Sequence, residues 1–186
     1  MIVGISGYGG AGKDTAADVL VAEAGFVKMS FADPMRAMAA AMNPIVGIRR
    51  DEFEQAVPVR YVEAVGRIGY REAKDTYPEI RTFLQRLGTD AGREVLGRDV
   101  WVNAQMDRIR DGIDVVLADM RFKNEAAAVE SRGGLTVRIE RPDCGPVNPH
   151  ISEVDLDDWP FMARISNDST VEALASAIME VTANER

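Results

Sequence analysis

The segment MIVGISGYGGAGKDT, residues 1–15, joins a short apolar stretch to a glycine-rich run and the start of a helical pattern. The apolar residues 2–5 predict a buried strand, and the glycines of residues 7–12 let the backbone fold tightly around an anion. Lys13 then supplies a cation where the helix begins. The stretch therefore predicts a phosphate-binding loop. A plain glycine turn with a solvated Lys13 is the alternative interpretation.

The loop departs from the pattern G-x-x-x-x-G-K-[ST] at one position, because Asp14 stands where a hydroxyl residue is expected and Thr15 follows one residue late. Asp14 could hold a divalent cation or its water, or it could stabilise the helix dipole as a first-turn carboxylate. These two roles are compatible. The loop residues expected to bind ATP are Gly7, Gly9, Gly10, Ala11, Gly12, Lys13, Asp14 and Thr15.

Length and composition favour one domain with a full core, since the chain has 186 residues of which 46% are hydrophobic. The net charge of −8 disfavours nucleic acid as a partner. Cys144 is the only cysteine, which excludes an internal disulfide and is consistent with a reducing compartment. Because no apolar run approaches the roughly 20 residues of a membrane span, we expect a cytoplasmic protein without membrane contact.

Strands are predicted at residues 2–6, 26–31, 115–118, 135–139 and 163–166, and helices at residues 16–24, 34–42, 78–96, 100–109, 124–131 and 171–182. This alternation predicts an α/β domain with a mainly parallel sheet. The charged residues 49–77 are the hardest to assign, and they favour an insertion or mobile element. Residues 141–158 are predicted to form a loop.

Ligands of parallel sheets bind beyond the carboxyl ends of the strands, so residues 7–15, 30–36 and 119–121 are expected on one edge with Arg141 and Asn167. Asp119 follows a continuous apolar run, which is typical of an acid that orients a metal ion or its water. A turn or capping residue is the alternative. The expected metal is Mg²⁺, bound with ATP, and its candidate ligands are Asp14, Thr15 and Asp119.

Five segments occur in a familiar order: GYGGAGKDT, FADPMR, LQRLGTDAGR, DMRFKNE and HISE. In these segments, and over nearly its whole length, the chain resembles bacteriophage deoxynucleoside monophosphate kinases. GKDT and DMRFKNE are the more specific parts. The resemblance implies a P-loop NTPase three-layer sandwich with a mainly parallel five-stranded sheet, like other nucleoside monophosphate kinases.

The same resemblance implies a single kinase domain, residues 1–186, with an acceptor-binding insert at about residues 33–98 and a lid-like loop at about residues 141–158. It implies transfer of the γ-phosphoryl group of ATP to a deoxynucleoside 5′-monophosphate. It also suggests a homodimer, and the host cytoplasm as location if the chain is phage-encoded.

Such a reaction needs in-line positioning and charge cancellation more than a base, since a phosphate monoester is already largely ionised at neutral pH. Arginines suit this task because the guanidinium stays protonated and binds phosphate oxygens in a fork, although any single arginine could be a solvated surface cation. The expected catalytic residues are Lys13, Asp119 and Arg121, with Arg121 bridging the donor and acceptor phosphates.

The remaining candidates are assigned to the acceptor, to ATP and to the lid. The expected acceptor-binding residues are Asp33, Arg36, Gln85, Arg86, Thr89 and Arg93. Asn167 is expected to contact ATP. The expected lid residues are Arg141, His150 and Glu153, and His150 is interpreted as a lid or structural residue rather than a base.

Two other functions fit parts of this pattern. Another small-molecule kinase, such as a dephospho-coenzyme A kinase, would share the donor loop and differ in the acceptor pocket. A regulatory module that binds nucleotide without phosphoryl transfer would need only the loop. The arginine set argues against the second alternative, because a switch does not need several cations for a second phosphate.

Overall fold

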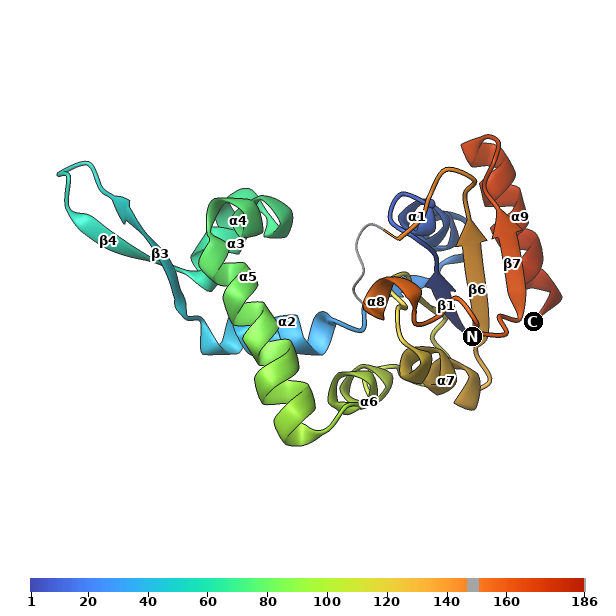
Figure 1. Cartoon of the computed structure of the whole chain (residues 1–186). Coiled ribbons are helices and arrows are strands. Elements are labelled where there is room, and N and C mark those ends of the chain that lie inside the picture. Colours follow the sequence, from blue (N-terminus) through green and yellow to red (C-terminus); the bar gives the residue numbers. More distant parts are fainter. Residues whose placement is uncertain (147–150, 186) are drawn as a thin grey trace. The chain divides into compact units, whose positions relative to one another are not determined.

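The computed structural model describes residues 1–146 and 151–185, which form two compact units (Figure 1). Unit 1 comprises Met1–Phe31 and Val102–Arg186, and unit 2 comprises Ala32–Trp101. The insert expected at residues 33–98 falls within unit 2. Among the described residues, none of the helices combines the length and the apolar character that a membrane span requires.

Unit 1 is built on five parallel strands in the order β2-β5-β1-β6-β7. The strands are β1 (Ile2–Ser6), β2 (Val27–Met29), β5 (Val115–Leu117), β6 (Leu135–Glu140) and β7 (Ala163–Ser166). Later strands add on opposite sides of β1, which makes its carboxyl end a topological switch point. The glycine loop leaves the sheet there. The predicted α/β fold with a five-stranded parallel sheet is confirmed.

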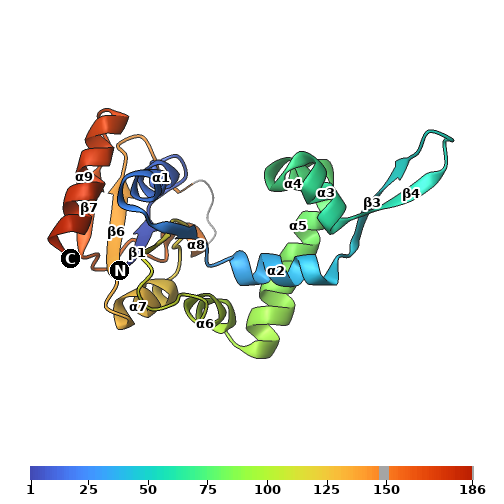
Figure 2. The ribbon, with the colours of Figure 1, turned by 180° about the vertical axis from the view of Figure 1, so that it is seen from behind.

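Helices cover both faces of this sheet. They are α1 (Lys13–Ala24), α7 (Lys123–Ser131), α8 (Ile151–Val154), α9 (Val171–Asn184) and α6 (Val100–Met106), whose first two residues belong to unit 2. Val3 and Ile5 pack in one core with α1 and α9, which lie in front of the sheet in Figure 2. Ile2, Val115 and Leu117 face the second core, with α6 and α7. The alternation of strand side chains thus produces three layers.

The Glu130 carboxylate links the segment before β7 to strand β6 of the sheet. Trp159 Nε1–H donates to Glu130 Oε1 at 3.0 Å, and the Thr136 hydroxyl donates to the same oxygen at 2.7 Å. Thr136 is fully buried, so its hydroxyl needs a partner inside the protein. The glutamate satisfies both donors and fixes the indole at the edge of the second core.

Unit 2 combines a hairpin with a set of helices (Figure 1). Its elements are α2 (Asp33–Met42), β3 (Ile45–Arg50), β4 (Ala56–Arg60), α3 (Tyr61–Ile68), α4 (Tyr70–Thr76), α5 (Pro78–Gln85) and the π-helix η1 (Arg86–Leu96). The two strands pair antiparallel. Val46 and Val59 from the hairpin join Ile80 and Leu84 of α5 in a separate hydrophobic core.

The structure refines the prediction in three stretches, the first of which lies in the inserted unit 2, as one of its two interpretations expected. Residues 49–77 are ordered into the hairpin and two helices, because Val46, Val59 and Tyr61 find buried partners that are distant in sequence. The helix expected to reach residue 109 ends at Met106. The loop expected at residues 141–158 contains the short helix α8, which follows the undescribed residues 147–150.

The helix expected at residues 78–96 exists, but its second half is wound as the π-helix η1. Two glycines four residues apart lie at close contacts in this half. Trp101 Nε1–H donates to the carbonyl of Gly88 at 2.8 Å. A Cβ on Gly88 would lie 2.8 Å from Met35 Sδ, and one on Gly92 would lie 2.6 Å from the Trp101 ring. The absence of a side chain at these glycines lets Met35 and Trp101 pack directly against the helix backbone.

We expect Gly92→Ala to lower the free energy of unfolding by about 1–3 kcal/mol, because the added methyl group overpacks the contact with Trp101. Gly66→Ala is the matched control: Gly66 is an exposed residue of α3 with nothing within 4 Å of an added Cβ. This control should raise the free energy of unfolding by about 0.5–1 kcal/mol. Urea unfolding followed by far-UV circular dichroism measures both, and equal shifts in the two variants would contradict the explanation.

Candidate active site

The glycine loop packs against β6 and against the residue that follows β7. A Cβ on Gly7 would lie 2.4 Å from the carbonyl oxygen of Ile139, and one on Gly12 would lie 2.5 Å from Asn167 Nδ2. Gly7 and Gly12 also have φ values of +147° and +104°, in the region that favours glycine. Both the contacts and the dihedral angles therefore require glycine at the two ends of the loop.

Lys13 begins α1 and folds its side chain back over the loop. Its Nζ donates to the carbonyl oxygens of Gly7 at 2.6 Å and Tyr8 at 2.8 Å. Burial lowers the pKa of Lys13 below its ordinary value, and the charge of Arg121 lowers it further, whereas Asp14 acts in the opposite direction. The ammonium group therefore lies at the loop in an environment that an added anion would make more favourable.

Asn167 fastens the loop from β7. Its Nδ2–H donates to the carbonyl oxygen of Ala11 at 2.8 Å, and its backbone N–H donates to the carbonyl oxygen of Glu140 at 2.7 Å. The predicted ATP contact is thus a residue that contacts the loop itself. Arg141 also reaches the loop, since its Nη1–H donates to the carbonyl oxygen of Gly10 at the long distance of 3.5 Å.

Asp14 is an exposed first-turn carboxylate with a lysine beside it. Lys28 Nζ donates to Asp14 and to Asp18, in both cases at 2.9 Å. Burial alone would lower the pKa of Lys28. The two carboxylates have the larger combined effect, so the pKa of this lysine is raised. Asp14 therefore already has a cationic partner, while its neighbour Thr15 is half-buried.

Asp119 follows β5 and is fixed from the adjacent strand β2. Its Oδ2 accepts a hydrogen bond from the Ser30 hydroxyl, and its Oδ1 accepts one from the backbone N–H of Phe31 at 3.0 Å. Ionised carboxylates have about four lone-pair sites, so two bonds leave capacity for a cation or its water. The two hydrogen bonds thus orient the Asp119 carboxylate and leave some of its oxygen lone pairs available.

Within residues 1–146 and 151–185, no three His, Cys, Asp or Glu side chains gather into a cluster able to hold a metal. Mg²⁺ in proteins usually takes one or two carboxylates and fills its other positions with waters and substrate phosphates. The role of Asp119 as a ligand of Mg²⁺ stays a prediction.

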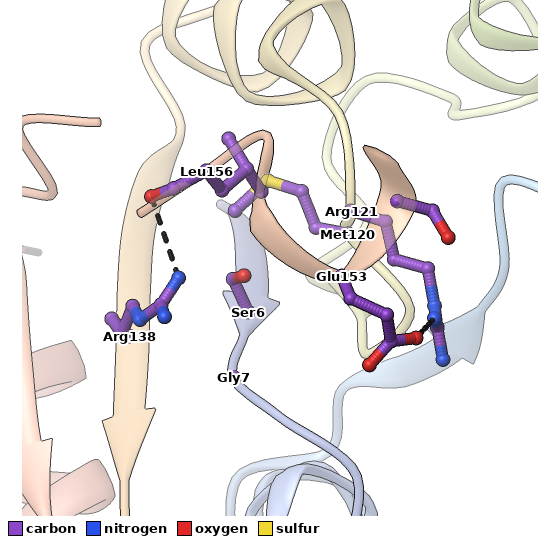
Figure 3. A pocket seen from close by; sticks show the side chains of 8 residues that line it. Ser6, Gly7, Met120, Arg121, Arg138, Glu153 and Leu156 are labelled. Carbon is purple, nitrogen blue, oxygen red and sulfur yellow. Dashed lines mark hydrogen bonds and ion pairs between the residues drawn. The ribbon is translucent and has the colours of Figure 1, made fainter. Parts of the chain in front are cut away.

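Arg121 is placed by a buried glutamate at the start of α7. Glu125 Oε2 accepts the backbone N–H of Arg121 at 2.6 Å and that of Phe122 at 3.0 Å, which caps the helix. The Arg121 guanidinium then donates to Glu153 Oε1 at 2.6 Å, as Figure 3 shows. The arginine is therefore held at both its backbone and its side chain.

Arg138 was not predicted as a site residue, although it is buried in β6 directly opposite Ser6 of β1. Its Nη2–H donates to Asp157 Oδ1 at 2.6 Å, and its guanidinium lies 4.9 Å from the centre of the Tyr8 ring. The Tyr8 hydroxyl donates to the other oxygen of Asp157 at 2.8 Å. Burial and this bond raise the pKa of Tyr8. The available signal in the sequence was a charged residue between the apolar residues Val137 and Ile139 of a central strand.

Arg121 and Arg138 line one hollow at the end of β1, whereas Lys13, Asp119 and Asn167 are not among its lining residues (Figure 3). Its lining residues are Ser6, Gly7, Met120, Arg121, Arg138, Ser152, Glu153 and Leu156. The hollow brings two arginines to the first residue of the glycine loop. Of the expected lid residues, it includes Glu153, while His150 lies outside the described residues.

In unit 2, Asp33 and Arg36 form an ion pair of 3.0 Å within α2. The Arg36 guanidinium lies 5.0 Å from the centre of the Tyr70 ring. Tyr61 is buried in the same unit. Burial raises the pKa of Tyr61 most, and the neighbouring Tyr70 raises it further, whereas the charge of Arg36 lowers it. The two tyrosines were not predicted as site residues, because the pattern of residues 49–77 is weak.

The other expected acceptor residues lie along α5 and η1. Gln85 ends α5 and Arg86 begins η1, and both are exposed, as is Thr89. Arg93 is half-buried one turn further on. Their contact with the acceptor stays a prediction.

Comparison with known proteins assigns the chain to a family. A sequence model described as "Deoxynucleotide monophosphate kinase" matches residues 54–178, more than half of the chain. The chain belongs to the deoxynucleotide monophosphate kinase family. The resemblance predicted from segments such as GKDT and DMRFKNE is confirmed, and the protein is an enzyme, a nucleotide kinase.

Two viral proteins are similar to this kinase over almost their whole length. "Putative deoxynucleotide monophosphate kinase" of Acanthamoeba polyphaga mimivirus is 28% identical, over 99% of this chain and 97% of that one. "Deoxynucleotide monophosphate kinase" of Enterobacteria phage T4 is 25% identical, over 95% of this chain and 96% of that one. Among solved structures, shikimate kinase from Aquifex aeolicus vf5 matches with a TM-score of 0.47 and 10% identity, over 99% of this chain and 97% of that one.

Glu125→Ala should lower the free energy of unfolding of the kinase by about 1–3 kcal/mol, because two backbone donors at the start of α7 lose a buried acceptor. Turnover should fall as well, since the backbone of Arg121 loses its anchor. Denaturant unfolding and a steady-state assay measure the two effects. Glu172→Ala, at an exposed first-turn glutamate of α9, is the control: it should lower the free energy of unfolding by less than Glu125→Ala does and leave turnover unchanged. An unfolding free energy of Glu125→Ala equal to that of the unmodified protein would refute the anchoring role.

Proposed function

We propose that this kinase transfers the γ-phosphoryl group of ATP to the 5′-phosphate of deoxynucleoside monophosphates. The observation that carries the proposal is a second, accessible cation beside the phosphate-binding loop: Arg121 adjoins Gly7 at the end of β1, and its charge acts on Lys13. One loop can bind a donor, but additional arginines beside it suit a second phosphate. The names of the viral relatives support a deoxynucleoside monophosphate as the acceptor.

The loop and Lys13 would bind the donor. Backbone N–H groups at the start of α1 favour an anion, and Lys13 adds a full positive charge at the same place. The lysine now donates to the carbonyl oxygens of Gly7 and Tyr8, so phosphate oxygens would replace those acceptors. Asn167 would keep the loop in position from Ala11 during this exchange.

Asp119 is the residue we propose for Mg²⁺, directly or through water, with Asp14 and Thr15 as further candidates from the loop. The ion would neutralise negative charge on the β- and γ-phosphate oxygens. Asp14 would have to exchange its bond with Lys28 for such a role. The bonds from Ser30 and Phe31 would hold the Asp119 carboxylate in one orientation throughout.

Arg121 would stabilise the charge shared by donor and acceptor phosphates during in-line transfer. The acceptor oxygen is already largely ionised at neutral pH, because the second pKa of a phosphate monoester is about 6. The reaction therefore needs positioning and positive charge rather than a general base.

For the acceptor, we propose contacts with the Asp33–Arg36 pair and with residues of α5 and η1. Arg36 is oriented by Asp33 and by the Tyr70 ring, so its guanidinium is preorganised for a phosphate. The further acceptor residues we propose are Gln85, Arg86, Thr89 and Arg93. Arg141 and Glu153 would belong to the closing loop.

A product assay tests the reaction class and the acceptor together. The protein is incubated with ATP, Mg²⁺ and each deoxynucleoside or ribonucleoside monophosphate in turn, and the diphosphates are separated by chromatography. Formation of a deoxynucleoside diphosphate with equimolar ADP is the expected result. Phosphorylation of dephospho-coenzyme A alone, or slow ATP hydrolysis indifferent to every acceptor, would overturn the proposal.

We expect Lys13→Ala and Arg121→Ala each to lower kcat about 100-fold or more, because each removes a positive charge directed at the transferring phosphoryl group. Arg50→Ala is the control, since Arg50 is exposed on the hairpin of unit 2 and pairs with its sequence neighbour Glu54. Its kcat should match that of the unmodified enzyme. Near-normal turnover of either site variant, with its fold intact by circular dichroism, would refute the role of that residue.

Nucleotide binding should be accompanied by proton uptake at alkaline pH. Burial and Arg121 hold the pKa of Lys13 below its ordinary value in the free protein, and bound phosphates would raise it. Between the free and bound pKa values, Lys13 therefore gains a proton as ATP binds. Calorimetric titration in buffers of different ionisation enthalpy measures this uptake, and Lys13→Ala should remove it. Heats that do not depend on the buffer would contradict the expectation.

A further inference from the structure

Arg121 is paired with a carboxylate of its own chain at the hollow. Its Nη1–H donates to Glu153 Oε1 at 2.6 Å, and Figure 3 shows the two side chains directed toward each other. The Glu153 side chain is only 10% exposed, whereas that of Arg121 is 45% exposed. The carboxylate is thus the more buried partner, and the guanidinium remains accessible.

Glu153 presents to Arg121 the kind of group that a nucleotide would present. A carboxylate offers oxygens to a guanidinium in the same planar fork as a phosphate does. The charge of Glu153 also acts on Lys13, where it favours the protonated form. One side chain thus supplies negative charge to both cations that are proposed to bind phosphate.

The segment after this carboxylate is fastened by other contacts. Asp155 Oδ2 accepts the backbone N–H of Lys123 at 2.9 Å, and Asp158 pairs with Lys123 Nζ at 2.8 Å. Asp157 accepts the Arg138 guanidinium at 2.6 Å. These bonds do not involve Arg121, so a change confined to position 153 should leave the segment docked.

We propose that Glu153 is an internal substitute for a nucleotide phosphate on Arg121, and that it sets nucleotide affinity by competing for this arginine. The inference rests on the proposed function, because it takes Arg121 as a phosphate-binding group. When a phosphate binds, the guanidinium exchanges carboxylate oxygens for phosphate oxygens. This exchange gives up the Arg121–Glu153 ion pair, and the loss of that pair opposes binding. Glu153 is in this sense a positioning residue that acts through Arg121.

Glu153→Gln tests the competition, because it keeps the shape of the side chain and removes its charge. The probe is inorganic tripolyphosphate, titrated calorimetrically into the full chain. Replacing a charge-assisted hydrogen bond by a neutral one should lower the dissociation constant of tripolyphosphate about tenfold. Asp158→Asn is the matched control: it removes the same charge from the same segment and leaves the Arg121 pair intact. Its dissociation constant should equal that of the unmodified protein.

Steady-state kinetics separate competition from simple orientation of Arg121. Competition predicts that Glu153→Gln lowers KM for a nucleotide, whereas orientation of Arg121 alone predicts a lower kcat at unchanged KM. A lower kcat at unchanged KM would overturn the inference, and so would tripolyphosphate binding no tighter than in the unmodified protein. Failure to phosphorylate any acceptor would instead refute the proposed function, and the tripolyphosphate comparison distinguishes the two failures.

A second variant covers the case in which Glu153→Gln does not fold. Glu153→Asp keeps the charge but shortens the side chain by one methylene, which withdraws the carboxylate from Arg121. Its dissociation constant for tripolyphosphate should lie between that of the unmodified protein and the tenfold lower value expected above. An unchanged constant in folded Glu153→Asp would overturn the inference.

Discussion

The backbone of the glycine loop approaches its neighbours more closely than any side chain would allow, and the active site of unit 1 depends on this approach. Gly7 lies against the Ile139 carbonyl of β6, and Gly12 lies against Asn167 after β7. These contacts fix both ends of the loop to one edge of the sheet. The start of α1, and with it Lys13, is consequently held where β1 ends. A methyl group at either glycine would separate the loop from the strands that position it.

Each cation at this edge of the sheet is bonded to an oxygen of the protein that a phosphate oxygen could replace. The protein carries a net charge of −8, yet Lys13, Arg121 and Arg138 gather around one loop. Lys13 uses loop carbonyl oxygens, Arg121 uses Glu153, and Arg138 uses Asp157. Desolvated cations without such partners would be unfavourable. A polyanionic ligand would therefore enter a site whose cations are already satisfied, and its affinity would depend on the difference between old and new partners.

The sequence predicted unit 1 well because its strands are continuous apolar runs and its loop has a fixed motif. Unit 2 was harder, because the hairpin carries charges and Pro58, and its pairing with α5 is visible only in three dimensions. Part of the site could not be predicted for the same reason, because its contacts join residues that are distant in sequence. Arg138 looked like an ordinary strand residue, since its partners Tyr8 and Asp157 lie far away in the chain. Asp14 was recognised, but its pairing with Lys28 was not.

The two tryptophans are distributed so that each unit holds one. Trp101 donates its indole N–H to Gly88 of the π-helix, and Trp159 donates its own to Glu130 beside β6. The first indole is bonded to a neutral carbonyl oxygen and the second to a carboxylate, so their local fields differ. The protein thus contains a separate intrinsic fluorophore for each unit. Replacing either one by phenylalanine would leave the emission of a single tryptophan at a known place in the fold, without any external dye.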